Sequence, residues 1–349
     1  MTSRAFVAAL LVGLGATACR TVPEPRGTAG TLLAIGGGLD DDSQFVYERL
    51  LALAAAHGPA RLAIVTAATG PEQQEAIDKA EALRAWAPGV AVDVIWRDTP
   101  TEATVAAIEG ATALFFTGGD QARITVRYRP DGAATPEWLA MRGLLARGGV
   151  IAGASAGCAM LGREMLLGGD SAAALRDGAR VGPGMAFVDC VLTDSHFFER
   201  DRLGRLVAAA MGGSVVGLGV GEDAAVEIDL ATGVATGLTT AQTLLVDARR
   251  ARRDGGRWTG LRARLLGRGE RWSLRDGAGD AAVPPPPVGA PSVVPVVEPG
   301  QNRQLASWRV LRFAQQADGG CWRLAFDGWA LLAWPDGQGA IALQLELTP

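Results

Sequence analysis

Gly153-Ala154-Ser155-Ala156-Gly157 follows a short apolar run and leads into a segment compatible with a helix. A serine between small residues at a strand-to-helix turn is typical of a nucleophile elbow. The glycines allow the sharp turn, and the amide that follows the serine, at the start of the helix, can stabilise an oxyanion. The same motif also arises by chance in a glycine-rich chain, so a purely structural turn is the alternative.

A serine nucleophile normally needs a histidine base, and this chain has two histidines, His57 and His196. His57 lies at the expected C-terminus of a helix, where a histidine commonly caps the helix or faces solvent. His196 ends an apolar run, at the kind of strand end where the sites of α/β proteins are built. In a serine hydrolase, His196 is therefore the base by elimination. Otherwise it is a hydrogen-bonded polar group at a strand end.

Short apolar segments alternate with helix-compatible segments from about residue 30 onward. The expected strands are residues 32–35, 61–65, 92–96, 113–116, 150–152, 215–220, 225–228 and 242–246. The expected helices are residues 43–56, 72–86, 101–109 and 200–211. This alternation predicts βαβ units, a mostly parallel sheet and the α/β fold class.

The composition is that of a globular protein with one large domain. Of the 349 residues, 48% are hydrophobic and 20% are charged, and the net charge is −4. We therefore expect no basic surface that recruits nucleic acid. Two histidines, and cysteines without metal-ligand spacing, predict no metal site and no cofactor.

The N-terminus has the features of a targeting segment. Residues 1–18 are typical of a signal peptide, with Arg4 before an apolar stretch too short to span a bilayer unaided. Cys19 directly follows Ala-Thr-Ala, which resembles a lipobox and predicts a lipid on Cys19. Residues 19–29 then indicate a flexible tether. We expect an exported lipoprotein of the cell envelope that touches the membrane only through this lipid, with a periplasmic or secreted form as the alternative.

The C-terminal part differs in composition. Residues 281–305 are rich in proline and predict a linker. Residues 306–349 predict a small β appendage with strands in segments 308–313, 321–326 and 341–345, whose tryptophans form its own core.

The cysteines give no complete disulfide scheme. With Cys19 lipidated, Cys158, Cys190 and Cys321 remain, and an odd number leaves at least one of them unpaired. Cys158 and Cys190 are most simply small buried residues. The sequence leaves the oligomeric state open, and a homodimer is compatible with it.

Several glycine-rich loops follow the expected strands. Gly36-Gly37-Gly38 and Thr117-Gly118-Gly119-Asp120-Gln121 are two of them, and the second can offer backbone N–H donors. A third, at residues 217–223, carries the carboxylate of Glu222.

A series of basic residues follows His196. Arg200, Arg202 and Arg205 lie on or near one expected helix, and Arg202 and Arg205 share a face of it. A solvated helix face is the alternative to a binding role.

Together these ordered motifs resemble the cyanophycinase family, serine peptidases related to the aspartyl dipeptidases. The resemblance covers roughly residues 30–275, within an expected peptidase domain at residues 30–280. It implies a three-layer α/β/α sandwich like that of class I glutamine amidotransferases. It also implies exopeptidase activity on cyanophycin or related β-aspartyl-arginine peptides.

The resemblance implies a role for each matching residue. Ser155 is the expected nucleophile, His196 the base and Glu222 the acid that orients the base. The backbone N–H groups expected in the oxyanion hole are those of Gly118, Gly119 and Ala156. Arginine side chains would pair with substrate carboxylates, and an aspartate would meet a substrate guanidinium. The residues expected at the substrate site are Asp120, Gln121, Asp194, Arg200, Arg202 and Arg205.

The chain departs from the usual family pattern at Ala154, Ser195 and Gly221, where Thr, Gln and Asp are common. The resemblance therefore bears on the catalytic chemistry more than on the particular substrate. A Gly-x-Ser-x-Gly esterase of the α/β-hydrolase type is a weaker alternative, since that fold needs a late histidine and none follows His196. A non-catalytic lipoprotein that binds peptides is another, although a binder need not keep Ser, His and Glu together.

Overall fold

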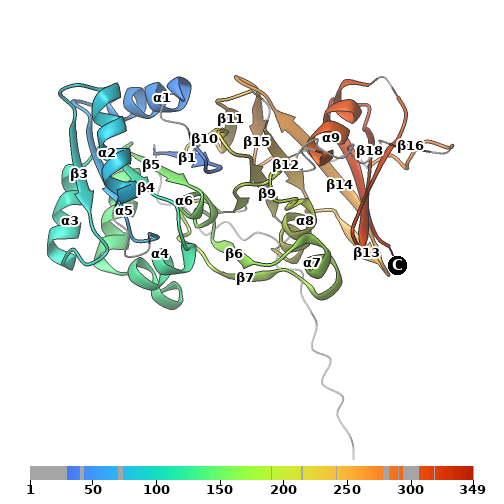
Figure 1. Ribbon diagram of the computed structural model, residues 1–349, viewed down its shortest axis with the longest axis horizontal. Coiled ribbons are helices and arrows are strands. Elements are labelled where there is room, and N and C mark those ends of the chain that lie inside the picture. Colours follow the sequence, from blue (N-terminus) through green and yellow to red (C-terminus); the bar gives the residue numbers. More distant parts are fainter. Residues whose placement is uncertain are drawn as a thin grey trace, which may run out of the picture.

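The structure is a computed structural model, and it describes ten ranges of the chain (Figure 1). These are residues 30–39, 43–69, 74–189, 191–213, 215–240, 242–277, 283–289, 291–293, 306–317 and 319–348. The expected signal peptide, the tether, Cys19 and Cys190 lie outside these ranges. Within the ranges, no helix has the length and apolar character needed to cross a membrane.

The first sheet has eight strands in the order β15-β11-β10-β1-β5-β4-β2-β3. Its parallel strands are β1 (Thr31–Ile35), β2 (Arg61–Val65), β3 (Ala91–Ile95), β4 (Ala113–Phe116) and β5 (Val150–Ala154). Its antiparallel strands are β10 (Ala225–Asp229), β11 (Val234–Gly237) and β15 (Arg271–Ser273). The predicted α/β class with a mostly parallel central sheet is confirmed.

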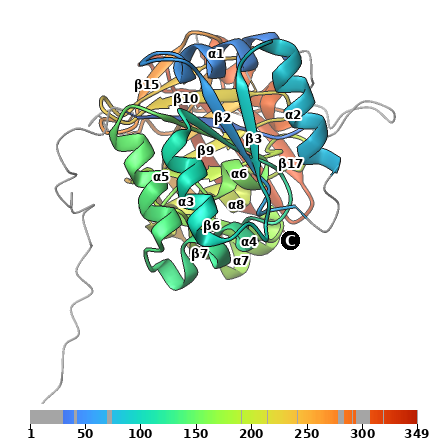
Figure 2. The ribbon, with the colours of Figure 1, turned by 90° about the vertical axis from the view of Figure 1, so that its left-hand side faces the viewer.

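Helices cover both faces of this sheet and create three layers (Figure 2). On one face lie α1 (Gln44–Ala54) and α2 (Gln74–Trp86). The buried residues of α1, at positions 46, 47, 50 and 54, form one stripe at helical spacing. The helices of the other face are α3 (Thr101–Gly110), α4 (Gln121–Tyr128), the 3₁₀ turn η1 (Pro130–Gly132), α5 (Pro136–Ala146) and α6 (Ala156–Ala159).

A second, mainly antiparallel sheet has nine strands in the order β16-β17-β18-β19-β14-β12-β9-β8, with β13 paired to β14. The strands are β8 (Val191–Asp194), β9 (Val216–Val220), β12 (Thr243–Asp247), β13 (Arg252–Asp254), β14 (Arg257–Leu266), β16 (Ser292–Val293), β17 (Trp322–Phe326), β18 (Trp329–Pro335) and β19 (Ile341–Leu347). The remaining elements are α7 (Ser171–Asp177), α8 (Leu203–Gly213), α9 (Ala306–Gln316) and the hairpin of β6 (Glu164–Gly168) and β7 (Arg180–Pro183).

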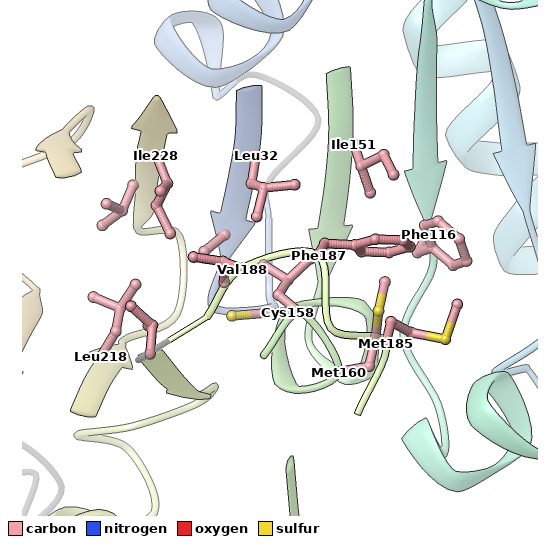
Figure 3. Close-up of a cluster of buried hydrophobic side chains, with 14 of the residues drawn as sticks. Leu32, Phe116, Ile151, Cys158, Met160, Met185, Phe187, Val188, Leu218 and Ile228 are labelled. Atoms are coloured by element: carbon pink, nitrogen blue, oxygen red, sulfur yellow. The ribbon is translucent and has the colours of Figure 1, made fainter. Parts of the chain in front are cut away.

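One hydrophobic core joins the two sheets. Figure 3 shows Phe187 and Val188 among side chains of the first sheet, such as Ile228, and of the second sheet, such as Leu218. Each of these four residues is buried. The parallel strands and the second sheet therefore pack against a common core.

The predicted C-terminal β appendage needs a correction. Strands at 321–326 and 341–345 are confirmed by β17 and β19, but β19 pairs directly with β14 of the expected peptidase domain. The last residues therefore extend the second sheet. The predicted strand at 308–313 is wrong, because this segment lies in α9, whose buried positions 306, 310, 311 and 314 follow a helical period.

Candidate active site

Ser155 lies at the turn between β5 and α6, in a backbone conformation that is rare for a residue with a side chain. Its φ is 53° and its ψ is −107°. A Cβ at Gly153 would lie 2.1 Å from the Gly157 carbonyl oxygen, so only glycine lets the strand and the helix approach this closely. Such strain at a strand-to-helix turn is typical of a nucleophile elbow.

His196 contacts both Ser155 and Glu222. Its Nε2 lies 2.8 Å from Ser155 Oγ, and its Nδ1 lies 2.6 Å from Glu222 Oε1. A carboxylate can only accept at Nδ1, so this nitrogen carries the proton and Nε2 accepts from the serine hydroxyl. The arrangement can therefore move a proton from the serine to the imidazole. His57, the other histidine, is exposed in the segment after α1.

The loop after β1 connects the three segments that carry these side chains. The Ser155 amide donates to the carbonyl oxygen of residue 35 at 3.0 Å, and the His196 amide donates to that of residue 36 at 2.8 Å. The Asp223 amide, next to Glu222, donates to that of residue 37 at 3.0 Å. The role of this glycine motif is not predictable from a single sequence, because nothing in the sequence shows which segments the loop contacts.

The expected oxyanion-hole residues lie at the carboxyl ends of the parallel strands β4 and β5 of the first sheet. Ala156 is the first residue of α6, and the first amides of a helix have no partner within it. Gly118 and Gly119 follow β4, which pairs in parallel with β5, so their loop and the Ser155 turn lie at the same carboxyl end. Their role in binding an oxyanion stays a prediction.

Asp120 and Gln121 both have structural partners. The Asp120 carboxylate caps α4 by accepting from the Ala122 amide at 2.9 Å. The Gln121 amide donates to the Leu166 carbonyl oxygen at 2.7 Å and so ties α4 to β6. That these two residues also bind substrate stays a prediction.

Asp194 and Arg205 form a buried ion pair, and that they contact substrate stays a prediction. Arg205 donates through Nε and Nη2 to the two Asp194 oxygens at 2.7 and 2.6 Å, and the two residues are 6% and 0% exposed. Arg202 donates to the same carboxylate at 3.2 Å and to the Ser195 carbonyl oxygen at 2.5 Å. The hydrogen bonds among these groups stabilise the turn that carries His196. Of the arginine series, Arg200 is the exposed member.

Burial also changes the acid–base properties of groups around this turn. Desolvation lowers the pKa of the Arg202 guanidinium to about 10, although Asp194 opposes this shift. Desolvation raises the pKa of the Cys158 thiol, three residues after the candidate nucleophile, and Asp194 raises it further. Cys158 therefore stays protonated and does not compete as a nucleophile. Cys158 and Cys321 are both free.

Gln242 supports the segment that carries Glu222, and no motif in the sequence points to this contact. With its amide nitrogen turned toward the acid segment, it donates to the Glu222 carbonyl oxygen at 3.0 Å and to a Glu199 carboxylate oxygen at 3.3 Å. In the described ranges, no cluster of three or more His, Cys, Asp or Glu side chains could hold a metal ion.

Known proteins share parts of this sequence. No protein-family model matches the chain. The cyanophycinase of Trichormus variabilis is 35% identical over 122 residues, which cover 34% of this chain and 39% of that protein. The cyanophycinase of Synechococcus elongatus is 33% identical over 129 residues, which cover 36% of this chain and 39% of that protein. The chain thus matches about two fifths of the length of these relatives.

The fold has a solved counterpart. The crystal structure of a peptidase from an acI-B1 actinobacterium superposes with a TM-score of 0.51 at 20% identity, covering 70% of this chain and 97% of that one. The likeness shows that the two proteins share an α/β fold. Over about a third of its length, the chain is similar in sequence to cyanophycinases.

We predict that Gly37→Ala slows the reaction of Ser155 with a fluorophosphonate probe by on the order of 100-fold, the loss typical of a misplacement of about 1 Å. Gly37 has a φ of +99°, and a Cβ there would lie 2.5 Å from His196 Cε1 and Nε2. The imidazole would have to move away from the serine. Labelling rates measured by mass spectrometry test this.

Gly58→Ala is the matched control for that variant. Gly58 also has a positive φ, +147°, but a Cβ there meets nothing within 4 Å. Alanine at residue 58 is therefore also strained by a positive φ, but its Cβ does not clash with a neighbouring atom. Equal labelling rates in the two variants would contradict the positioning role of residue 37.

We predict that Arg205→Ala lowers the free energy of unfolding by about 3–5 kcal/mol, because it leaves the Asp194 carboxylate buried and unpaired. Arg200→Ala, at the exposed end of the same series, should change it by no more than about 0.5 kcal/mol. Urea denaturation of both variants measures the difference. Similar stabilities would show that the buried pair does not brace this region.

Proposed function

We propose that this protein is an exported serine-type exopeptidase that hydrolyses cyanophycin or related β-aspartyl-arginine peptides. The single observation that carries the proposal is the continuous hydrogen-bond chain from Ser155 through His196 to Glu222, at 2.8 and 2.6 Å. The partial identity to cyanophycinases supports the substrate class.

The proposed reaction uses Ser155, His196 and Glu222 in turn. Ser155 Oγ attacks the carbonyl carbon of the scissile amide while His196 Nε2 takes the hydroxyl proton. Glu222 accepts from Nδ1–H, which keeps the imidazole in the productive tautomer and stabilises the cation that forms. The imidazolium then gives its proton to the leaving amine, and water releases the acyl group from the serine.

The proposed oxyanion hole consists of backbone amides at the same edge of the sheet. The Ala156 amide follows the nucleophile directly, and Gly118 or Gly119 supplies the second donor from the loop after β4. Arg200 is exposed beside the base and is available to a substrate carboxylate.

We predict that Ser155→Ala and His196→Ala each reduce hydrolysis of a cleaved β-aspartyl dipeptide by about 10⁴–10⁶-fold, the loss typical of a triad member. Both variants should unfold at the wild-type urea midpoint. The measurement is kcat on a panel of β-aspartyl dipeptides and on cyanophycin.

His57→Ala is the matched control, since His57 is exposed and is the other histidine of the chain. It should keep wild-type turnover. Near-normal turnover by His196→Ala would overturn the triad, and wild-type protein that labels with a fluorophosphonate but cleaves no member of the panel would overturn the substrate class.

We also propose that Cys19 is the lipid-bearing N-terminus of the mature protein, which the Ala-Thr-Ala-Cys stretch after an apolar segment supports. Mass spectrometry of the N-terminal peptide from membranes should find acyl chains on Cys19, and Cys19→Ser should move the protein to the soluble fraction. An unmodified Cys19 in a soluble wild-type protein would contradict this.

A further inference from the structure

A cavity of about 370 Å³ lies beside the acid of the triad. Its walls come from the start of α1, the turn after β9, the turn between β11 and β12, and the loop between β14 and β15. Glu222 lines this cavity and also binds His196. A ligand that contacts Glu222 in the cavity is therefore separated from the imidazole by the Glu222 side chain. Small-molecule sites span about 300–1,000 Å³, and a volume near the lower end suits a group of amino-acid size.

Arg268 supplies the positive charge of this cavity. Its guanidinium carbon lies 3.6 Å from the centroid of the Phe45 ring, and both side chains are exposed. Stacking uses the flat face of a guanidinium and leaves its N–H edge available for a carboxylate. Among the described residues, none forms an ion pair with Arg268.

Two carboxylates supply the negative charge of the same cavity. Asp223 is exposed, and one of its oxygens accepts a hydrogen bond from the Ser43 hydroxyl. The Glu222 side chain is 43% exposed and bonds His196 through Oε1, which leaves its second oxygen for another partner. The cavity therefore presents groups for both an anion and a cation.

We propose that this cavity is the subsite for a zwitterionic amino-acid unit of the peptide substrate. The carboxylate of that unit binds the Arg268 guanidinium, and its cationic nitrogen lies toward Asp223 and Glu222. A purely anionic ligand is repelled by the two carboxylates, and a purely cationic one leaves Arg268 without a partner. The inference rests on the proposed peptidase function and adds where one charged end of the substrate binds.

Steady-state kinetics with β-aspartyl-arginine and its two monoamides, one at each carboxyl group, test the subsite. We expect Arg268→Gln to raise KM for the dipeptide by about ten- to 150-fold, the effect of a lost charge-assisted hydrogen bond, with kcat near wild type. Amidation of one of the two carboxyls should raise KM in the wild type and remove the difference between wild type and Arg268→Gln.

Arg271→Gln is the matched control, an exposed arginine three residues away in β15 that does not line the cavity. It should keep the wild-type KM. The proposal is overturned if Arg268→Gln behaves like Arg271→Gln, or if it raises KM equally for the dipeptide and both monoamides.

Calorimetric binding of the dipeptide separates this inference from the proposed activity. Ser155→Ala should bind the dipeptide without cleaving it, and adding Arg268→Gln, but not Arg271→Gln, should weaken that binding. Binding with this pattern but without turnover by the wild type supports the subsite and overturns the activity. Absence of binding to both wild type and Ser155→Ala overturns the subsite.

Discussion

Three consecutive carbonyl groups, at residues 35–37, connect the three segments that carry the side chains of the candidate site. They accept the amides of Ser155, His196 and Asp223, which come from segments far apart in the sequence. Each such bond contributes only about 0.5–1.5 kcal/mol net to stability. Their larger effect is geometric. Because β1 lies in the middle of the first sheet, hydrogen bonds to the residues at its end set the positions of the three segments relative to one another. A side chain at residue 37 would occupy the space of the imidazole.

Backbone strain gathers at the same three segments. Ser155, His196 and Asp223 have φ values of 53°, 44° and 50°, where residues with side chains are uncommon. Each such conformation costs on the order of 1–3 kcal/mol and persists only where the surroundings enforce it. Here the carbonyls of residues 35–37 and the buried pair of Asp194 with Arg205 enforce it. The stability of the core is therefore used in part to hold the site in a conformation that the local sequence disfavours.

The sequence predicts strand bounds and site residues that depend on a local pattern. It does not predict structure that depends on the pairing of distant segments. Strands β2 and β4 have the expected bounds because short apolar runs between turns leave little choice, and the elbow serine and the second histidine are predictable because few residues could fill those roles. The pairing of β19 with β14 is a contact across some eighty positions that no local pattern reports. Segment 308–313 has an alternation that also fits one stripe of α9, and packing on the sheet selects the helix.

The arginines show most clearly why residue type alone does not assign a role. Arg205 belongs to a recognisable motif, yet its donors face a buried carboxylate, so its charge is neutralised before any substrate arrives. Arg268 belongs to no motif and stands in a loop, yet its guanidinium rests on an aromatic ring at the rim of a cavity. In the first case the charge fixes the backbone turn of His196, and in the second it faces solvent, where a ligand can compete for it. If the proposed function holds, specificity is expected to reside in loop residues that vary independently of the buried pairs around the candidate site.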